Sequence, residues 1–243
     1  MPEKLDVGIM QPYFFPFLGH FDLINRTSKW IVFDVIEFRS RTFMSRNRVL
    51  EPNRGEQYIS LPVNKKTGPK MSDIRVFEPQ VALQKNLGQL RVYQNKAPYY
   101  DEVITLIEQA FNSAASDLLR DINVQTVKLA CERFGIDFDY AICSELNLDF
   151  SNIEHAGSWA LEICKQLSAN SYLNPPGGRD LFIKGEWDQA GIELYFANPP
   201  TMEYETHYKL PFRADLSIVD VMMWNSPESI KECLDSCKEP VRA

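Results

Sequence analysis

The chain has 243 residues, 44% hydrophobic and 24% charged, so it is long enough and apolar enough to bury a globular core. Its net charge of −7 argues against nucleic-acid binding, because nucleic-acid binders displace phosphate counterions with a basic stripe. The one basic cluster, at residues 39–54, is too short for a nucleic-acid groove but could hold one anionic ligand.

The first 34 residues predict a strand, a loop, a helix and a second strand. Val7–Gln11 is a short apolar run typical of a buried strand, and the two prolines in Pro12–Pro16 exclude a regular helix there. Helical spacing returns in Leu18–Asn25, and Trp30–Asp34 is a β-branched and aromatic run. A helical crossover between two strands predicts a βαβ unit with parallel strands.

The middle of the chain is predicted to be mostly helical. Apolar residues recur at helical spacing in three segments, and a glycine follows the last of them where a C′ residue is expected. The predicted helices are Leu83–Tyr93, Glu102–Phe111 and Leu118–Phe134, and the predicted strands before them are Tyr58–Val63 and Ile74–Phe77. We expect one domain over residues 1–243, with a mostly helical segment at about residues 79–135.

The third quarter alternates strand and helix again, and the chain closes with two helices. Ser151–Glu154 resembles a capping box that opens a helix, and Ser226-Pro227 is a good start for the last helix. The remaining predicted elements are strands at Tyr140–Cys143, Tyr172–Leu173 and Ile192–Phe196 and a helix at Ile218–Trp224. The expected fold is therefore α/β, with a mostly parallel sheet, a Rossmann-like opening unit and an inserted helical layer.

Other patterns bear on location and metals. No run of about 18 apolar residues predicts a membrane span, and no signal-like segment opens the chain, so we expect a cytoplasmic protein. The five cysteines favour buried, reduced thiols over a disulfide or a metal site, because only Cys233 and Cys237 form a pair at short spacing. Three histidines at unrelated spacings do not predict a metal site, and no cofactor is identified.

The first candidate site lies where the first strand gives way to a helix. Gly19 and His20 stand at the predicted helix start, where free N–H groups and the helix dipole attract anions. The layout is similar to the HxGH motif of adenylyl-transferring enzymes, although Phe17 replaces the first histidine. His20 is the candidate catalytic acid–base group, with an ordinary pKa near 6.5. The alternative is a helix-start histidine with a structural role.

Two further segments are candidate binding loops. Asp34, Arg46, Asn47 and Arg48 follow the second strand, and arginine recognises phosphate or carboxylate in bidentate fashion. In the loop Asn174–Gly178, the glycines Gly177 and Gly178 expose backbone N–H groups to an anion. The alternative for the segment with the arginines is a solvated surface. The alternative for the glycine loop is an ordinary strand-to-helix turn.

We expect these segments to converge. Parallel strands gather the loops that follow them at one sheet edge, so Gln11–Gly19, Arg46–Arg48 and Asn174–Gly178 should line one cleft. Asp220, inside an apolar run, needs a buried partner, and an arginine of residues 39–48 is the natural candidate. His155 is expected in the first turn of a helix, and His207 at the surface or near the pocket.

The chain resembles the WbqC-like family over nearly its whole length. The blocks that carry the resemblance are Gln-Pro-Tyr-Phe-Phe-Pro-Phe-Leu-Gly at 11–19, Phe-Asp at 33–34, Arg-Asn-Arg at 46–48, Lys-Ala-Pro-Tyr-Tyr at 96–100, Ala-Asn-Ser-Tyr-Leu at 169–173, Gly178, Phe212 and Leu-Ser-Ile-Val-Asp at 216–220. We assign Gln11 and Tyr13 of the first block to substrate binding. His20 stands where the family leads us to expect an aromatic residue such as tyrosine.

The resemblance implies a role in O-antigen, lipopolysaccharide or capsule biosynthesis. One hypothesis is a transferase-like enzyme whose small anionic substrate is a nucleotide-linked or phosphorylated sugar, with acyl or aminoacyl transfer to a sugar amine. A second is an adenylyl or nucleotidyl transferase that uses Gly19-His20 on a triphosphate. A third is a non-catalytic accessory protein of a glycan pathway.

Overall fold

The computed structural model describes residues 4–64, 70–208 and 210–243. Its centre is a six-stranded sheet in the order β10-β9-β8-β1-β2-β7, in which only β10 runs antiparallel to its neighbour. The strands are β1 (Leu5–Met10), β2 (Thr27–Val32), β7 (Tyr140–Ile142), β8 (Ser171–Asn174), β9 (Glu193–Phe196) and β10 (Val241–Arg242). The predicted α/β class with a mostly parallel sheet is confirmed.

The opening βαβ unit forms as predicted. β1 and β2 are parallel neighbours, with Val7 opposite Lys29 and Met10 opposite Val32. Between them the chain returns through α1 (Leu18–Asn25), whose residues are buried from Leu18 to Ile24. The two prolines of the intervening loop delay the helix until the chain has turned.

The strand order reverses direction beside β1. The chain first adds β2 and then β7 on one side of β1, and later adds β8 and then β9 on the other side. In open α/β sheets, ligands bind at such a reversal, outside the carboxyl ends of the strands. We call the side on which the parallel strands end the carboxyl edge.

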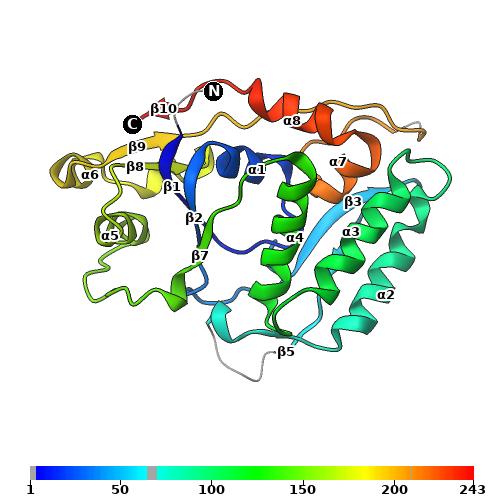
Figure 1. Cartoon of the computed structure of the whole chain (residues 1–243), viewed down its shortest axis with the longest axis horizontal. Helices are drawn as coiled ribbons and strands as arrows, with labels where there is room; N and C mark the ends of the chain where they lie inside the picture. Colours follow the sequence, from blue (N-terminus) through cyan, green and yellow to red (C-terminus); the bar gives the residue numbers. More distant parts are fainter. Residues whose placement is uncertain (1–3, 65–69, 209) are drawn as a thin grey trace.

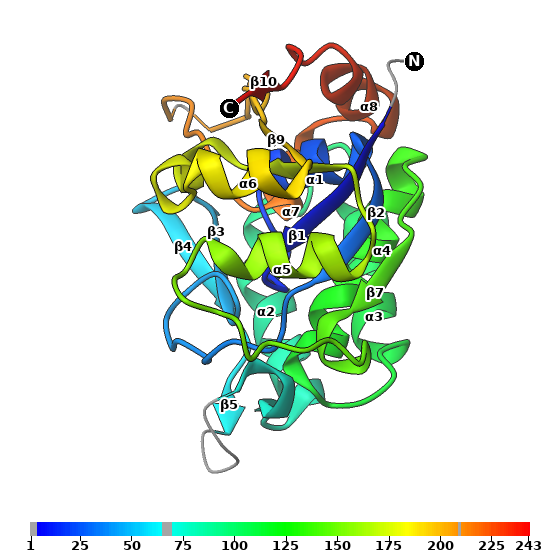
Figure 2. The ribbon, with the colours of Figure 1, turned by 90° about the vertical axis from the view of Figure 1, so that its left-hand side faces the viewer.

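Helices cover both faces of the sheet (Figures 1 and 2). α5 (Ser158–Gln166) and α6 (Lys184–Ala190) lie on one face, while α1 and α4 (Leu119–Phe134) lie on the other. Each face has its own core, because alternate side chains of a strand point in opposite directions. Ile31 packs with the α5 and α6 side and Trp30 with the larger core on the α1 side.

The central part of the chain adds a helical layer outside α4. α2 (Pro79–Leu90) packs on α3 (Tyr100–Asn112), and α3 packs on α4. Gly135 follows the last residue of α4 with a φ of 66°, as its position predicted. Two small antiparallel sheets precede these helices: β3 (Arg46–Glu51) with β4 (Gly55–Ser60), and β5 (Val63–Asn64) with β6 (Arg75–Val76). Short 3-10 turns complete the segment at Met71–Asp73 and Arg91–Tyr93.

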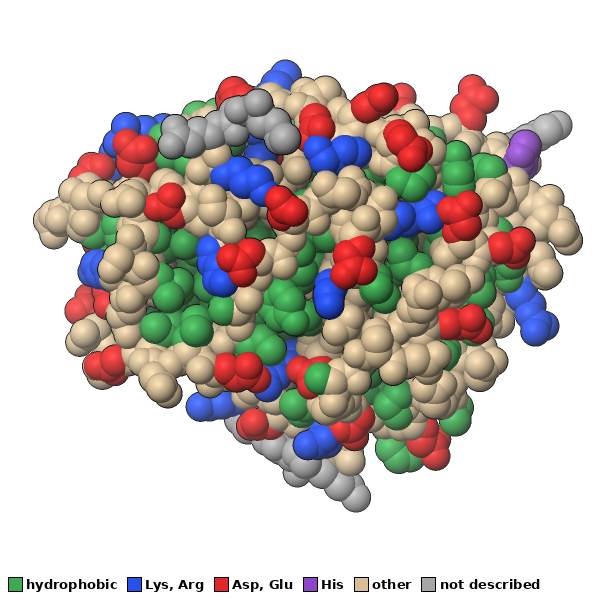
Figure 3. Space-filling view, viewed as in Figure 1, with side chains coloured by type: hydrophobic (Ala, Val, Ile, Leu, Met, Phe, Trp, Pro, Cys, Tyr) green, Lys and Arg blue, Asp and Glu red, His purple; other side chains and the backbone are tan. Residues whose placement is uncertain are grey.

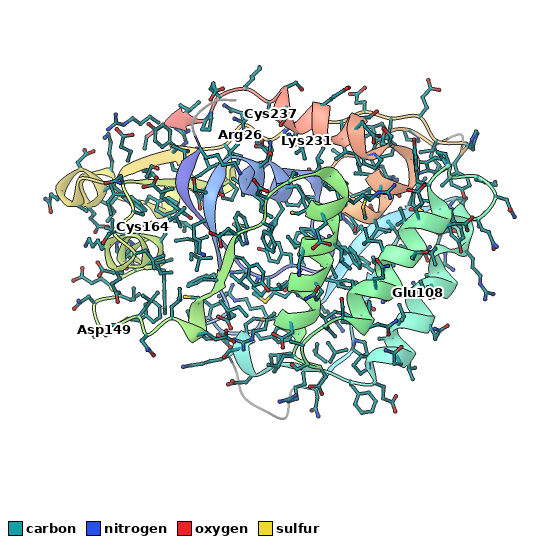
Figure 4. The ribbon with its side chains drawn as sticks, viewed as in Figure 1. Arg26, Glu108, Asp149, Cys164, Lys231 and Cys237 are labelled. Atoms are coloured by element: carbon teal, nitrogen blue, oxygen red, sulfur yellow. The ribbon has the colours of Figure 1, made fainter. Side chains whose placement is uncertain are left out.

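The last helices are α7 (Ile218–Trp224) and α8 (Pro227–Asp235). Ser226 caps α8 as predicted, since its hydroxyl accepts a hydrogen bond from the Ser229 N–H at 3.1 Å. Arg26, at the end of α1, donates to the carbonyl of Cys237 at 2.9 Å, and Figure 4 shows the two residues together beside α8. This contact ties the C-terminal segment to the opening unit.

The predicted capping box at Ser151–Glu154 is wrong. The Ser151 hydroxyl donates to Asp149, and α5 begins only at Ser158, after a turn in which the Ser158 hydroxyl donates to the carbonyl of His155. His155 therefore precedes the helix instead of lying in its first turn. The Ser151 hydroxyl is hydrogen-bonded to the nearby Asp149 and therefore does not cap a helix.

The described surface is mixed in charge. On the face shown in Figure 3, acidic and basic side chains are interspersed among apolar ones. None of the helices described is long and apolar enough to cross a membrane, and the five cysteines are free.

Candidate functional site

The candidate site is the carboxyl edge of the sheet around β1, where the strand order reverses. Gln11 follows β1 directly, and Asn174 ends β8, the strand next to β1. Asp34 lies two residues after β2, and Ser144 two residues after β7. Four parallel strands thus deliver polar side chains to one edge of the sheet.

Asp34 is the anchor of this edge. Its buried carboxylate accepts hydrogen bonds from the N–H and the hydroxyl of Ser144, at 2.9 and 2.7 Å. Arg120, in the first turn of α4, donates to the same carboxylate at 2.6 Å. A buried carboxylate is stable only with such partners, so Asp34 holds α4 and the segment after β7 against the end of β2.

Gln11 and Tyr13 form a small polar pair above His20. The Tyr13 hydroxyl donates to Gln11 Oε1 at 3.1 Å, and the Tyr13 ring lies 5.9 Å from the His20 ring. His20 is 2% exposed and packs against Trp30, and burial lowers its pKa to about 3. The imidazole is therefore neutral at neutral pH, and its Nδ1 has no hydrogen-bond partner among the described residues.

Asn174 closes the other side of the edge. Its Oδ1 accepts from the Tyr172 hydroxyl at 2.7 Å, and its Nδ2 donates to the carbonyl of Pro175 at 2.7 Å. Gly178 packs so closely on Asn174 Nδ2 that a Cβ would collide with it, whereas a Cβ at Gly177 would enter open space. Gly178 is needed for this close approach, and Gly177 is free of that constraint.

The loop after β1 is held by polar side chains from other elements. Asn123 of α4 donates to the carbonyl of Pro12 at 2.8 Å, and Asn47 of β3 donates to the carbonyl of Phe15 at 2.7 Å. Ser217, just before α7, donates to the same Phe15 carbonyl at 2.8 Å. The loop's shape is thus fixed by α4, β3 and the start of α7.

Arg46 and Arg48 lie on one face of β3, two residues apart. The Arg46 guanidinium stacks 4.2 Å above the Tyr58 ring. Arg48 pairs with Glu56 at 3.4 Å and donates to the carbonyl of Asp215 at 3.3 Å. Their described partners therefore belong to the β3–β4 hairpin and to the segment before α7. None of these contacts involves Asp34 or Asn174.

Gly19 lines a small hollow of about 90 Å³ at the start of α1. Asp215 and Arg213 line the same hollow, together with Pro199 from the segment after β9. A Cβ at Gly19 would lie 2.6 Å from the Phe17 ring and 3.1 Å from Pro199 Cβ. Only glycine allows this approach without a shift of the neighbours.

Asp220 has different partners from those expected. The hypothesis of an arginine from residues 39–48 is wrong: Asp220 accepts from the hydroxyls of Tyr93 and Tyr204 and from the Leu50 N–H at 2.9 Å. Burial raises the pKa of its carboxyl group, although these hydrogen bonds act in the opposite direction. Neutral donors thus satisfy a buried acid without a countercharge.

The predicted segments are brought together only in part. Hydrogen bonds join the Gln11–Gly19 loop to Asn47, while Asn174 and Gly178 lie at the same sheet edge and contact their own strand and loop. Sequence reasoning missed Arg120 and Ser144, which have no motif around them. Among the described residues, no group of three or more His, Cys, Asp and Glu side chains could hold a metal ion.

Comparisons with known proteins extend these observations. A family model described as the WbqC-like protein family matches residues 11–232. "Uncharacterized protein Rv1507c" of Mycobacterium tuberculosis (strain ATCC 25618 / H37Rv) is 22% identical over 233 residues, which cover 93% of this chain and 98% of that protein. No solved structure matches the chain significantly. The family match includes every residue discussed at the carboxyl edge.

Proposed function

The chain belongs to the WbqC-like protein family, and on that premise we propose that it is a transferase-like enzyme of bacterial surface polysaccharide biosynthesis. Its substrate is an activated sugar, such as a nucleotide sugar, from the O-antigen, lipopolysaccharide or capsule pathways of the cytoplasm. The reaction that best suits it is transfer of an acyl or aminoacyl group to a sugar amine.

One observation supports the proposal most strongly: the strand order reverses between β1 and β8. At such a reversal the loops that follow neighbouring strands separate and leave room for a ligand. Here Gln11 and Tyr13 come from one side and Asn174 from the other. Amide and hydroxyl groups suit the hydroxyls and phosphates of an activated sugar, because they both donate and accept hydrogen bonds.

His20 has a restricted role in this proposal. A neutral, buried imidazole can accept a proton from a substrate only if the ligand displaces the Tyr13 ring above it. His20 can therefore reach the ligand only in a state in which the Tyr13 ring moves, and it stays our candidate catalytic group for that state.

Isothermal titration with UDP-N-acetylglucosamine tests the proposed site. Gln11→Glu keeps the shape of the side chain and adds a negative charge near the expected phosphates, so affinity should fall at least about tenfold. Gln80→Glu, on the exposed start of α2, adds the same charge far away and should leave affinity unchanged. Equal affinity for the wild type and Gln11→Glu would exclude this edge as the nucleotide-sugar site.

The small hollow at Gly19 favours a second candidate, an adenylyl or nucleotidyl transferase. The α1 start and Arg213 line that hollow and attract phosphate, although Asp215 lines it too and Arg213 lies 3.6 Å from Glu56. This candidate predicts that ATP with magnesium raises the midpoint of thermal unfolding more than UDP-N-acetylglucosamine does. The opposite order, with exchange of pyrophosphate into ATP undetectable, favours the sugar transferase.

A further inference from the structure

A separate cavity opens beside α7, away from the residues assigned to the activated sugar. It has a volume of about 410 Å³, enough for one sugar ring, and is lined mostly by residues 203–206, 208 and 210–213. It shares Tyr204, Phe212, Arg213 and Leu216 with the hollow at Gly19, so the two spaces adjoin.

The floor of the cavity is a hydrogen-bonded polar network. Asp220 lines it and is held by Tyr93, Tyr204 and the Leu50 N–H, from three different parts of the chain. The Tyr204 ring is thereby fixed in the wall, and Phe212 meets it edge-on at 5.8 Å. Phe212 is 38% exposed, which is high for a phenylalanine, and its ring is available to a ligand that enters.

The charge of the walls decides which ligand fits. Glu203 and Glu205 line the cavity, and the one arginine described in its wall, Arg213, is already 3.6 Å from Glu56. Asp220 adds a third acid below them. Among the described residues that line the cavity, carboxyl groups outnumber cationic groups, so an ammonium group is attracted both to the carboxylates and to the aromatic rings.

We propose that this cavity binds a sugar unit with a free amino group, the acceptor of the transfer reaction. The aromatic rings of Tyr204 and Phe212 take the sugar ring, and Glu203 and Glu205 take the ammonium group. The assignment as acceptor rests on the proposed function, but the binding chemistry does not. The activated sugar is assigned to the carboxyl edge, so the two substrates bind at separate places.

Saturation-transfer NMR and titration with glucosamine, N-acetylglucosamine and glucose test the inference. Glucosamine should bind about five- to tenfold more tightly than the other two, as expected for exposed carboxylates and a ring face acting on one ammonium group. In Glu203→Gln/Glu205→Gln this preference should fall below about twofold, while glucose affinity stays the same. Raising the salt concentration should weaken glucosamine binding selectively.

Glu108→Gln/Glu132→Gln is the matched control, because it removes two acidic charges from α3 and α4, away from the cavity (Figure 4 labels Glu108). It should leave the preference intact. Equal binding of the three sugars, no binding of any, or an undiminished preference in Glu203→Gln/Glu205→Gln would each overturn the inference. UDP-N-acetylglucosamine affinity, measured in the same variants, reports separately on the proposed function and should not change.

Discussion

The Asn47 side chain donates through Nδ2 to the carbonyl of Phe15, 2.7 Å away, and Phe15 has a φ of 41°. A bulky residue in the left-handed region is strained by about 1–3 kcal/mol, and such strain persists only where the surroundings impose it. The Phe15 N–H donates to Thr126 and its carbonyl also accepts from Ser217. Three side chains thus maintain the turn that leads to Gly19.

Replacing Asn47 with alanine should lower the free energy of unfolding by about 2–3 kcal/mol. The change leaves the buried carbonyls of Phe14 and Phe15 with fewer donors, and an unsatisfied buried polar group costs about 1–3 kcal/mol. Asn53→Ala, in the exposed β3–β4 turn, is the control and should change stability by about 1 kcal/mol or less. Chemical denaturation measures the free energy of unfolding of both variants. Equal losses of stability would show that Asn47 does not maintain the turn at Phe15.

Gly19→Ala and Gly88→Ala should have opposite effects on thermal stability. A Cβ at Gly19 would press on Phe17 and Pro199, so α1 must shift and the hollow beside it should change shape. A Cβ at Gly88, within α2, meets nothing within 4 Å and should stabilise the helix by about 0.5–1 kcal/mol. Calorimetry of the two variants decides; a Gly19→Ala protein as stable as the wild type contradicts the close approach.

His20 should destabilise the protein in acid. Its pKa is about 3 in the folded protein and near 6.5 when unfolded, so below about pH 6.5 only the unfolded chain takes up the proton. Relative to His20→Phe, the wild type should lose about 2 kcal/mol between pH 8 and pH 5, at about 1.4 kcal/mol per pH unit below 6.5. A difference that is constant with pH would mean that His20 has the same pKa in the folded and unfolded chain.

Asp220 should show the opposite dependence on pH. Burial raises its pKa above the ordinary value of 3.8, so the unfolded chain loses the proton first as pH rises. The wild type should therefore lose stability relative to Asp220→Asn as pH increases from about 4 through the folded-state pKa. An arginine partner would have lowered the pKa and reversed this trend, so the sign of the slope distinguishes the two environments.

The opening unit was predictable because its signals are local. The apolar run at Val7–Gln11, the prolines after it and the helical spacing of Leu18–Asn25 each depend on neighbours in sequence. Gly135 at the end of α4 and Ser226 at the start of α8 are local signals of the same kind. For these elements, tertiary packing agrees with the intrinsic preference of the chain.

The side-chain partners were not predictable, because they depend on long-range packing. Asp220 accepts hydrogen bonds from Tyr93 and Tyr204, and no spacing rule in the sequence predicts these partners. The β3–β4 hairpin places Arg48 opposite Tyr58 and beside Glu56, so Arg48 forms an ion pair within its own hairpin. The Ser151 prediction failed for a different reason: a nearby aspartate competed with the helix for the hydroxyl.

A crystal structure of the protein soaked with UDP-N-acetylglucosamine tests the central claim most directly. The account predicts the nucleotide sugar at the carboxyl edge between β1 and β8, with its polar groups within hydrogen-bond distance of Gln11 and Asn174. Density for the nucleotide sugar elsewhere, for example in the acidic cavity above Asp220, would contradict it.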